Sequence, residues 1–333
     1  MIASVPDLLR LVVLPVFAWA AWRDINTRRL PNRLWPPLVG LGVVLLAWEA
    51  FQLAPFGTFE GRLFLVQVAV SLLFIAPLGY AFWWLGGFGG ADAKALITLA
   101  ILLPTFPSYF LGSLQFPLVE TPIGVFSLTV LTNTVLMAAA VPVVLALRNL
   151  SQGDIEPRAM LFARRVDRAS LPDRHGTLFE TPEGITRSGL DLDALRMYLR
   201  WRGTTLADLR ADPESHRDPA SITDTHEPTD GGTHVDPRTD GGQVEADSDS
   251  PDSTADFGDP WAAEQFFEAI DGTAYGSSPE GLRAALELLS TTDRQQVWVS
   301  PGLPFVVPMF AGLVVAFTYG DLLFGLFGWL GLF

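Results

Sequence analysis

The sequence contains no cysteine, and only one of its 22 basic residues, Lys94, is a lysine. The absence of cysteine excludes disulfides and thiolate metal sites. Acidic residues outnumber basic residues by 36 to 22, which gives a formal net charge of −14. A surface rich in aspartate and poor in lysine stays hydrated at high ionic strength, where repulsion between carboxylates is screened. We therefore expect that the protein comes from a halophilic archaeon and that its acidic part faces a cytoplasm of high ionic strength.

Hydrophobic residues make up 49% of the chain, and several long stretches contain no charged residue. A stretch of about 20 apolar residues is long enough to cross the hydrocarbon core of a bilayer as a helix. The apolar stretches predict an all-α integral membrane protein with six transmembrane helices at 5–23, 34–54, 63–85, 95–118, 122–147 and 302–330. The first stretch does not resemble a cleavable signal peptide, because Asp7 and Arg10 stand where a basic cluster is expected.

The acidic charge is concentrated in residues 149–300, which hold 29 acidic and 14 basic residues. We expect this segment to be a large, partly disordered acidic cytoplasmic insert between the fifth and sixth helices. The predicted organisation is a membrane part at 1–148, a small folded segment at 149–210, an acidic disordered linker at 211–260, short amphipathic helices at 261–300 and the last membrane helix at 301–333. The acidity of the insert argues against nucleic acid as a partner.

Within the insert, three helices are predicted. Asp191 is a candidate N-cap and Gly203 a candidate stop for a helix in "LDLDALRMYLRWRG". Two shorter amphipathic helices are expected around "PWAAEQFFEAI" and "SPEGLRAALELL", each with a proline near its first turn.

Basic residues fix the predicted orientation of the chain, because short cytoplasmic loops of membrane proteins carry an excess of lysine and arginine. The loop after the first helix, "RDINTRRLPNR" at 23–33, contains four arginines. Placing it in the cytoplasm puts residues 86–94 and 148–301 inside as well, and 55–62 and 113–121 outside. We expect a multi-pass protein of the plasma membrane with both chain ends outside.

Two carboxylates stand out in this topology. Of the seven acidic residues outside the insert, only Asp24 and Asp92 fall at cytoplasmic ends of predicted membrane helices. Two carboxylates brought together in a site of low polarity share a proton, so one takes a proton from water while the other gives one to a peptide carbonyl. Gly89 and Gly90, just before Asp92, would let an extended substrate backbone approach closely.

Each residue also has a plainer interpretation. Asp92 could be an N-cap of the fourth helix, and Asp24 could be an ion partner of Arg28 or Arg29. Lys94 could be an interfacial lysine whose ammonium reaches the aqueous boundary. In the corresponding alternative, the protein is a polytopic transporter or membrane scaffold in which the two aspartates bind a cation or cap helices.

"DINTRRLPN" at 24–32, followed by "GGAD" at 89–92 and lysine at 94, resembles the two signature regions of the type IV prepilin peptidases, membrane aspartic proteases of the Gly-x-Gly-Asp type. The archaeal branch, which processes preflagellins (archaellins) and pilins, is the more similar. The closing "PGLPFVVPMFAGL" at 301–313 also resembles the entry to the last helix of that family. One departure is Ala91, where the family motif has glycine.

The resemblance implies that Asp24 and Asp92 are the catalytic pair, supported by the loop residues Gly89, Gly90, Ala91 and Lys94. It implies a membrane-embedded aspartic endopeptidase that needs no metal or cofactor and faces the cytoplasm. Its substrates would be prepilin-like or archaellin-like precursors, cut between a short charged leader and a hydrophobic helix. Bacterial members have a cysteine-containing loop and an N-methyltransferase activity, so the lack of cysteine here favours peptidase activity alone.

Overall fold

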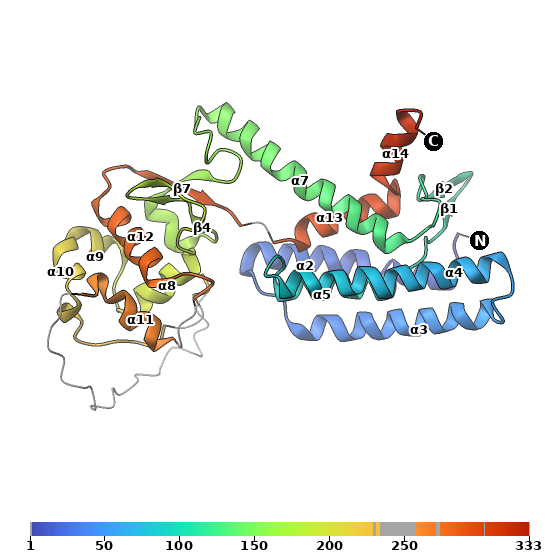
Figure 1. The fold of residues 1–333 in the computed structure, drawn as a ribbon, viewed down its shortest axis with the longest axis horizontal. Helices are drawn as coiled ribbons and strands as arrows, with labels where there is room; N and C mark the ends of the chain where they lie inside the picture. Colours follow the sequence, from blue (N-terminus) through green and yellow to red (C-terminus); the bar gives the residue numbers. More distant parts are fainter. Residues whose placement is uncertain (1, 229–230, 234–257, 271–273, 303, 333) are drawn as a thin grey trace. The chain divides into compact units, whose positions relative to one another are not determined.

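The computed structural model describes residues 2–332, with the exception of residues 229–230, 234–257, 271–273 and 303. The chain divides into two compact units (Figure 1). Unit 1 combines Met1–Val141 with Leu303–Phe333, and unit 2 is Pro142–Gly302.

Unit 1 is predominantly helical. Its helices are α1 (Val5–Arg10), α2 (Val13–Thr27), η1 (Asn32–Leu34), α3 (Trp35–Leu53), α4 (Phe59–Val70), η2 (Ser71–Ile75), α5 (Ala76–Trp84), α6 (Gly90–Leu102), α13 (Val306–Thr318), α14 (Leu322–Trp329) and the first part of α7 (Phe126–Gln152), which continues into unit 2. A hairpin of β1 (Tyr109–Leu111) and β2 (Leu114–Phe116) follows α6.

Four helical stretches of unit 1 and α7 are long and apolar enough to cross a membrane. They are Val5–Thr27, Asn32–Leu53, Phe59–Trp84 and Phe126–Gln152, which agree with the first, second, third and fifth predicted spans. The described chain is therefore a predominantly helical protein with membrane-spanning potential in these four stretches.

The two remaining predicted spans differ from the structure. The span expected at 95–118 is the 13-residue helix α6, which ends at Leu102. Pro104 lacks an amide hydrogen and disfavours helical geometry at the residue before it, so the helix stops and the chain turns into the β1–β2 hairpin. A helix of this length rises only about 20 Å, against a hydrocarbon core of about 30 Å.

The span expected at 302–330 is interrupted. Its first part, α13, also has 13 residues and ends at Thr318. Gly320 then adopts a φ of 99°, and the side chain of Asp321 accepts a hydrogen bond from the amide of Phe324 to begin α14. The motif Tyr-Gly-Asp is thus a helix break rather than the interior of one long helix.

Helix α6 lies in the middle of unit 1, where it packs against α3, α5 and α13. Its buried residues share the core with residues of α2, α3, α7 and α13. The buried apolar side chains of α6 are Ala93, Ala95, Leu96, Leu99, Ala100 and Leu102. Its short length is compatible with its position, because neighbouring helices rather than lipid surround most of it.

Unit 2 contains short strands as well as helices. The expectation of an all-α chain is therefore wrong for this unit. The strands are β3 (Arg164–Asp167), β4 (Thr177–Leu178), β5 (Glu180–Thr181), β6 (Gly184–Ile185) and β7 (Gln296–Ser300). The helices are η3 (Arg168–Asp173), α8 (Leu192–Trp201), α9 (Leu206–Ala211), α10 (Pro213–Arg217), η4 (Pro219–Ser221), η5 (Pro260–Ala262), α11 (Ala263–Ala269) and α12 (Pro279–Thr291).

One sheet joins the two ends of unit 2. Strand β7 lies between β3 and β4 and pairs antiparallel with both, while β5 and β6 form a separate hairpin. The alternation in "QVWVS" places Val297 and Val299 in the main core and Trp298 in a smaller cluster on the other side of the strand. Segments 149–210 and 261–300, which are predicted as separate segments, therefore share one core.

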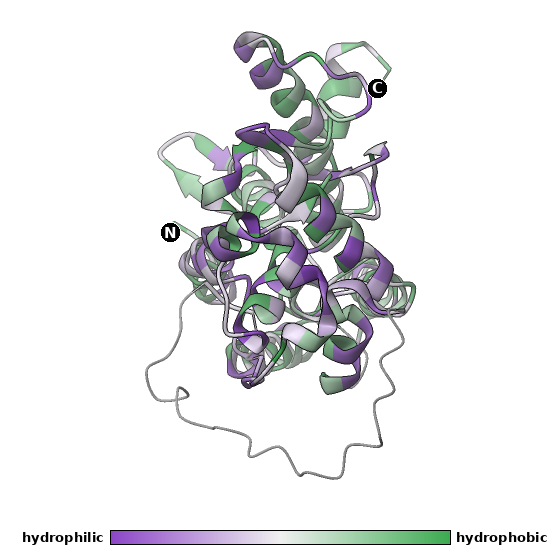
Figure 2. Ribbon diagram, turned by 90° about the vertical axis from the view of Figure 1, so that its left-hand side faces the viewer, coloured by the Kyte–Doolittle hydropathy of each residue, from purple (hydrophilic) through white to green (hydrophobic). Residues whose placement is uncertain are grey.

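The predicted helices of the insert are confirmed. Helix α8 begins after Asp191, whose side chain accepts the amide of Asp193, and Gly203 with a φ of 64° follows its end. Helix α12 begins at Pro279, and α11 lies within the other predicted segment. Figure 2 shows hydrophilic and hydrophobic residues alternating along the helices of unit 2, as expected for helices with one face in a core.

The linker predicted at 211–260 is ordered at its start, where α10 and η4 are formed. An aspartate N-cap explains each: Asp212 accepts from the amide of Ser215, and Asp218 from that of Ala220. Most of the remaining predicted linker, at 229–230 and 234–257, lies outside the described residues.

Candidate active site

Asp24 lies in the last turn of α2 and is only 6% exposed. The helix ends three residues later because Arg28 adopts a left-handed conformation, with a φ of 54°. The amide of Arg28 still donates to the backbone oxygen of Asp24, at 2.9 Å. The charge of Arg28 also acts on the carboxylate of Asp24. Arg28 thus interacts with Asp24 through its backbone amide and through its charge.

Asp92 lies in the first turn of α6, three residues after the N-cap residue Gly89. Its Oδ2 accepts the amide hydrogen of Gly89 at 3.3 Å, and the backbone N–H of Val306 also donates to the carboxylate. A carboxylate at this place is favourable, because amide groups without partners in the helix point toward it. Asp92 thus makes the contact of a capping residue, although Gly89 holds the N-cap position itself.

The structure brings the two aspartates near each other although 67 residues separate them in the sequence. The charges of Asp24 and Arg28 both act on the carboxylate of Asp92. The site therefore consists of two carboxylates with one guanidinium close to both.

A second contact joins the same two regions of the chain. The Nζ of Lys94, in α6, donates a hydrogen bond of 2.7 Å to Oδ1 of Asn32, at the start of η1. Lys94 is exposed, as expected for an interfacial lysine, but it also fixes the beginning of α6 against the loop that follows α2. Asn32 belongs to the "DINTRRLPN" motif, so this contact joins the two signature regions directly.

The short residues before Asp92 have different roles. A Cβ atom added to Gly89 would lie 3.1 Å from Oδ2 of Asp92, so glycine leaves room for the carboxylate. Gly90 and Ala91 begin α6, and Ala91 has no positive φ. Alanine therefore fits the position where the family motif has glycine, and the departure from the motif brings no backbone strain.

Two further residues belong near this site and are missing from the sequence-based site. Arg28 and Asn32 both lie in the quoted "DINTRRLPN" stretch, but a single sequence does not show that one faces the carboxylates and the other faces Lys94. No group of three or more metal-ligating side chains is found among the residues that the structure describes.

Asp321, the other buried aspartate near the end of the chain, has a structural role. It is 2% exposed and accepts hydrogen bonds from Oγ1 of Thr129 at 2.8 Å and from the amide of Phe324 at 3.0 Å. Asn133 donates to the backbone oxygen of Gly320 at 2.8 Å. The polar residues Thr129 and Asn133 of α7 thus make packing contacts with the break between α13 and α14.

These features describe a predominantly helical protein with apolar helices of membrane-spanning length and a pair of carboxylates at the ends of two of its helices. Comparison with family models gives the class. The model described as "Type IV leader peptidase family" matches residues 11–146, which include both aspartates. The model described as "Archaeal Peptidase A24 C-terminus Type II" matches residues 252–322. The chain is thus similar to the type IV leader peptidase family over residues 11–146 and to the archaeal C-terminal model of Peptidase A24 over residues 252–322.

Individual relatives agree with the family models. The chain is 28% identical over 160 residues to a preflagellin peptidase of Methanococcus voltae, covering 48% of this chain and 63% of that protein. It is 33% identical over 141 residues to the prepilin peptidase EppA of Methanothermobacter thermautotrophicus, covering 41% and 34%. A preflagellin peptidase of Methanocaldococcus jannaschii is 24% identical over 144 residues, covering 40% and 54%. The alignments thus span between a third and two thirds of the length of these curated relatives.

Proposed function

We propose that this protein is a membrane-embedded aspartic endopeptidase that removes a short, charged leader from prepilin-like and preflagellin-like precursors. The observation that carries the proposal is that the charge of Asp24 acts on Asp92, so that two carboxylates from separate signature regions, at the ends of α2 and α6, interact electrostatically. The names of the relatives, preflagellin peptidase and prepilin peptidase, support the choice of substrate.

In the proposed mechanism the two carboxylates share one proton before the reaction. The ionised carboxylate takes a proton from a water molecule, whose oxygen forms a bond to the scissile carbonyl carbon. The protonated carboxyl group gives its proton to the carbonyl oxygen, which produces a neutral diol intermediate. When the diol collapses, the C–N bond breaks, and the first carboxyl group gives its proton to the leaving nitrogen. The second carboxylate takes a proton from one hydroxyl of the diol as the new C=O bond forms. The two aspartates then again hold one proton between them.

The neighbours of the pair suit this mechanism. The guanidinium of Arg28 offsets part of the negative charge that two adjacent carboxylates bring to the site. The N–H groups of Gly89 and Val306 hold the carboxylate of Asp92 from two directions. Lys94 and Asn32 keep the start of α6 against the loop after α2. These contacts support the proposal that the two acids act together.

The arginine-rich loop at 23–33 supports a location of the site on the cytoplasmic side of the plasma membrane. We assign both chain ends to the outside and unit 2 to the cytoplasm on the basis of six crossings, in which the short helices α6 and α13, with the segments that follow them, complete two. Peptidase activity alone is proposed, without N-methyltransferase activity. The acidic, lysine-poor composition leads us to expect activity at high salt in a halophilic archaeon.

The proposal is tested with the purified full-length protein in lipid nanodiscs and an archaellin or pilin precursor from an archaeon. The expected result is a product whose mass equals that of the precursor without its leader, formed in buffer of high potassium chloride concentration. A precursor whose residues around the cut are scrambled serves as the matched control and stays intact. Cation uptake into vesicles together with an uncut precursor would instead favour a transporter.

A further inference from the structure

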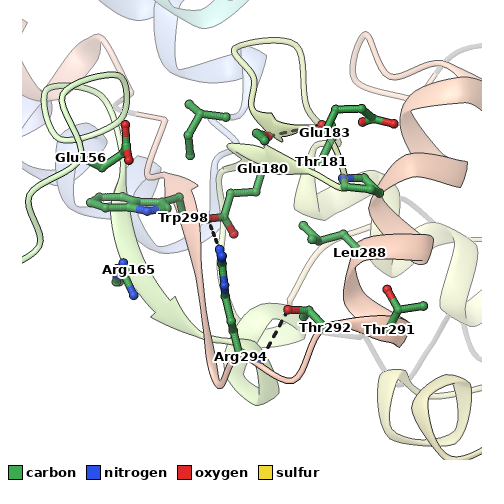
Figure 3. A pocket seen from close by; sticks show the side chains of 13 residues that line it. Glu156, Arg165, Glu180, Thr181, Glu183, Leu288, Thr291, Thr292, Arg294 and Trp298 are labelled. Carbon is green, nitrogen blue, oxygen red and sulfur yellow. Dashed lines mark hydrogen bonds and ion pairs between the residues drawn. The ribbon is translucent and has the colours of Figure 1, made fainter.

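Unit 2 contains a cavity of about 700 Å³ that the proposed peptidase chemistry does not use. Figure 3 shows it between the β5–β6 hairpin, strand β7 and the end of α12. This volume lies in the range of about 300–1,000 Å³ that is usual for small-ligand sites. The cavity is large enough for one long side chain together with the peptide backbone that carries it.

Glu180 is the buried acid of this cavity. It is 6% exposed, and its Oε2 has no hydrogen-bond partner of normal geometry among the residues that the structure describes, although the backbone N–H of Trp298 acts on the carboxylate. A buried charged acceptor without a donor is costly, so Glu180 is a group to which a ligand could supply a missing hydrogen bond. Burial also raises the pKa of Glu180, with the nearby Glu156 adding to the effect.

The cation closest to Glu180 within the described chain makes only a loose contact. Nη1 of Arg294 lies 3.8 Å from Oε1, beyond hydrogen-bond distance, and the side chain of Arg294 is 72% exposed. Figure 3 shows this arginine reaching across the cavity toward Glu180. The guanidinium of Arg294 thus lies near the carboxylate of Glu180, and its exposed side chain is free to turn toward the solvent.

The remaining charges also favour a cation. Glu156 and Glu183 line the cavity together with Glu180. The other lining arginine, Arg165, is engaged, because its Nε lies 3.2 Å from Asp154 and its guanidinium lies 5.4 Å from the ring of Trp298. An anion would meet three carboxylates here, whereas a cation would meet the exposed Arg294 and Arg165, whose charge is already paired with Asp154.

The walls of the cavity include an apolar surface beside the carboxylates. Trp298, Leu288 and Ile185 contribute it, next to the hydroxyl groups of Thr181 and Thr291. Lysine and arginine side chains combine an apolar stem with a charged end, and they bind well where an apolar wall leads to an acid.

We propose that this cavity binds the guanidinium or ammonium end of a basic side chain presented by a peptide. The charged end donates to the carboxylate of Glu180, and the methylene groups of the side chain lie along Trp298 and Leu288. Arg294 occupies the entrance in the free protein and leaves when the peptide enters. This assignment is independent of the peptidase activity, so it stands or falls by binding alone.

The test uses the full-length protein in nanodiscs and ligand-observed NMR titrations with acetyl-arginine methylamide. Acetyl-citrulline methylamide, which has nearly the same shape without the charge, is the matched control ligand. We expect saturable binding of the arginine compound and at least tenfold weaker binding of the citrulline compound. Agmatine carries the same guanidinium without a peptide backbone, and we expect it to bind more weakly than the arginine compound.

Three variants connect the binding to the cavity. Glu180→Gln should weaken binding of the arginine compound by roughly ten- to a hundredfold, as expected for the loss of one charge-assisted hydrogen bond. Glu268→Gln removes the same charge from an exposed position outside the cavity and should change the affinity by less than about threefold. Arg294→Gln removes the competing guanidinium and should strengthen binding, a result that a purely structural role of Glu180 would not produce.

Several results would overturn the proposal. Equal binding of the arginine and citrulline compounds would show that no cation is recognised. Unchanged affinity in a Glu180→Gln protein that melts at or above the wild-type temperature would place the binding elsewhere. Weaker binding after Arg294→Gln would show that Arg294 takes part in binding rather than competing. Agmatine binding as tightly as the arginine compound would overturn the peptide source of the cation.

Discussion

Arg10 offers a strong test of how unit 1 is held together. Its side chain is 1% exposed, and it reaches three partners from different parts of the chain. Nη1 lies 3.1 Å from Asp7, Nη2 lies 2.7 Å from Glu49, and Nε donates to the backbone oxygen of Leu102 at 3.2 Å. The network therefore ties α1 to the end of α3 and to the end of α6, the helix that begins near Asp92.

Replacing Arg10 by methionine keeps most of the volume and removes the cation from both acids. Loss of one partner from a buried ion pair costs about 3–5 kcal/mol. The side chains of Asp7 and Glu49 are 13% and 16% exposed, so water relieves part of this cost. We therefore expect a loss of about 3 kcal/mol in the free energy of unfolding, at the lower end of that range.

The assay is equilibrium unfolding of the full-length protein in mixed micelles with increasing sodium dodecyl sulfate, followed by far-ultraviolet circular dichroism. A triple variant, Arg10→Met with Asp7→Asn and Glu49→Gln, removes both acids together with the cation and should recover most of the lost stability. A single variant that loses less than about 1 kcal/mol would refute the reasoning, since that is the value expected of a surface pair. A triple variant no more stable than the single variant would refute it too.

Two further predictions concern the junction of the signature regions and the cavity of unit 2. Lys94→Met removes the hydrogen bond to Asn32. Because this contact is exposed, the variant should lower the rate of precursor cleavage by only about two- to fivefold, corresponding to roughly 0.5–1 kcal/mol, and leave the melting temperature unchanged. A complete loss of cleavage would show that Lys94 does more than position α6. Burial raises the pKa of the Glu180 carboxyl group in the folded protein above its value in the unfolded chain. At neutral pH the ionised carboxylate therefore lowers the free energy of unfolding. Glu180→Gln should therefore melt at a higher temperature than wild type at pH 7–8, and differential scanning fluorimetry should show this advantage disappearing as the pH falls to about 4; an advantage that persists at low pH would contradict a titrating Glu180.

The long apolar helices of unit 1 were predictable, because a stretch of about 20 uncharged residues leaves few alternatives to a membrane helix. Hydropathy could not show where α6 ends, since Phe106, Tyr109 and Phe110 continue the apolar stretch after Pro104. The same holds for the break at Gly320, where a single glycine with a positive φ interrupts a strongly apolar stretch. Pro104 and Gly320, rather than mean hydropathy, therefore determine where these two helices end.

The sheet of unit 2 was harder to predict. Strand β7 has only five residues, and its partners β3 and β4 lie more than 100 residues earlier in the chain. Short strands of this kind gain their stability from long-range pairing, which local patterns do not reveal. The helices around it were predictable from caps, such as Asp191 before α8 and Pro279 at the start of α12.

The two aspartates of the site could be selected from the sequence, because topology left no other acids at the cytoplasmic ends of membrane helices. The proximity of the two aspartates could not be predicted from the sequence, since it depends on how α2 and α6 pack in unit 1. The contact of Lys94 with Asn32 and the place of Arg28 near both acids likewise depend on tertiary structure. A single sequence identifies such residues as candidates and leaves their partners to the fold.

Cleavage of one precursor by wild type, Asp24→Asn and Asp92→Asn proteins tests the central claim most directly. Asparagine keeps the size of the side chain and removes the titrating proton, while Glu60→Gln, at an exposed position, controls for the loss of one charge. If the two aspartates act as one pair, each single asparagine variant loses cleavage by at least a thousandfold at normal protein level, corresponding to about 4 kcal/mol, and the Glu60→Gln protein cuts like wild type. If either asparagine variant still removes the leader at a rate near that of wild type, the two aspartates are not the catalytic pair.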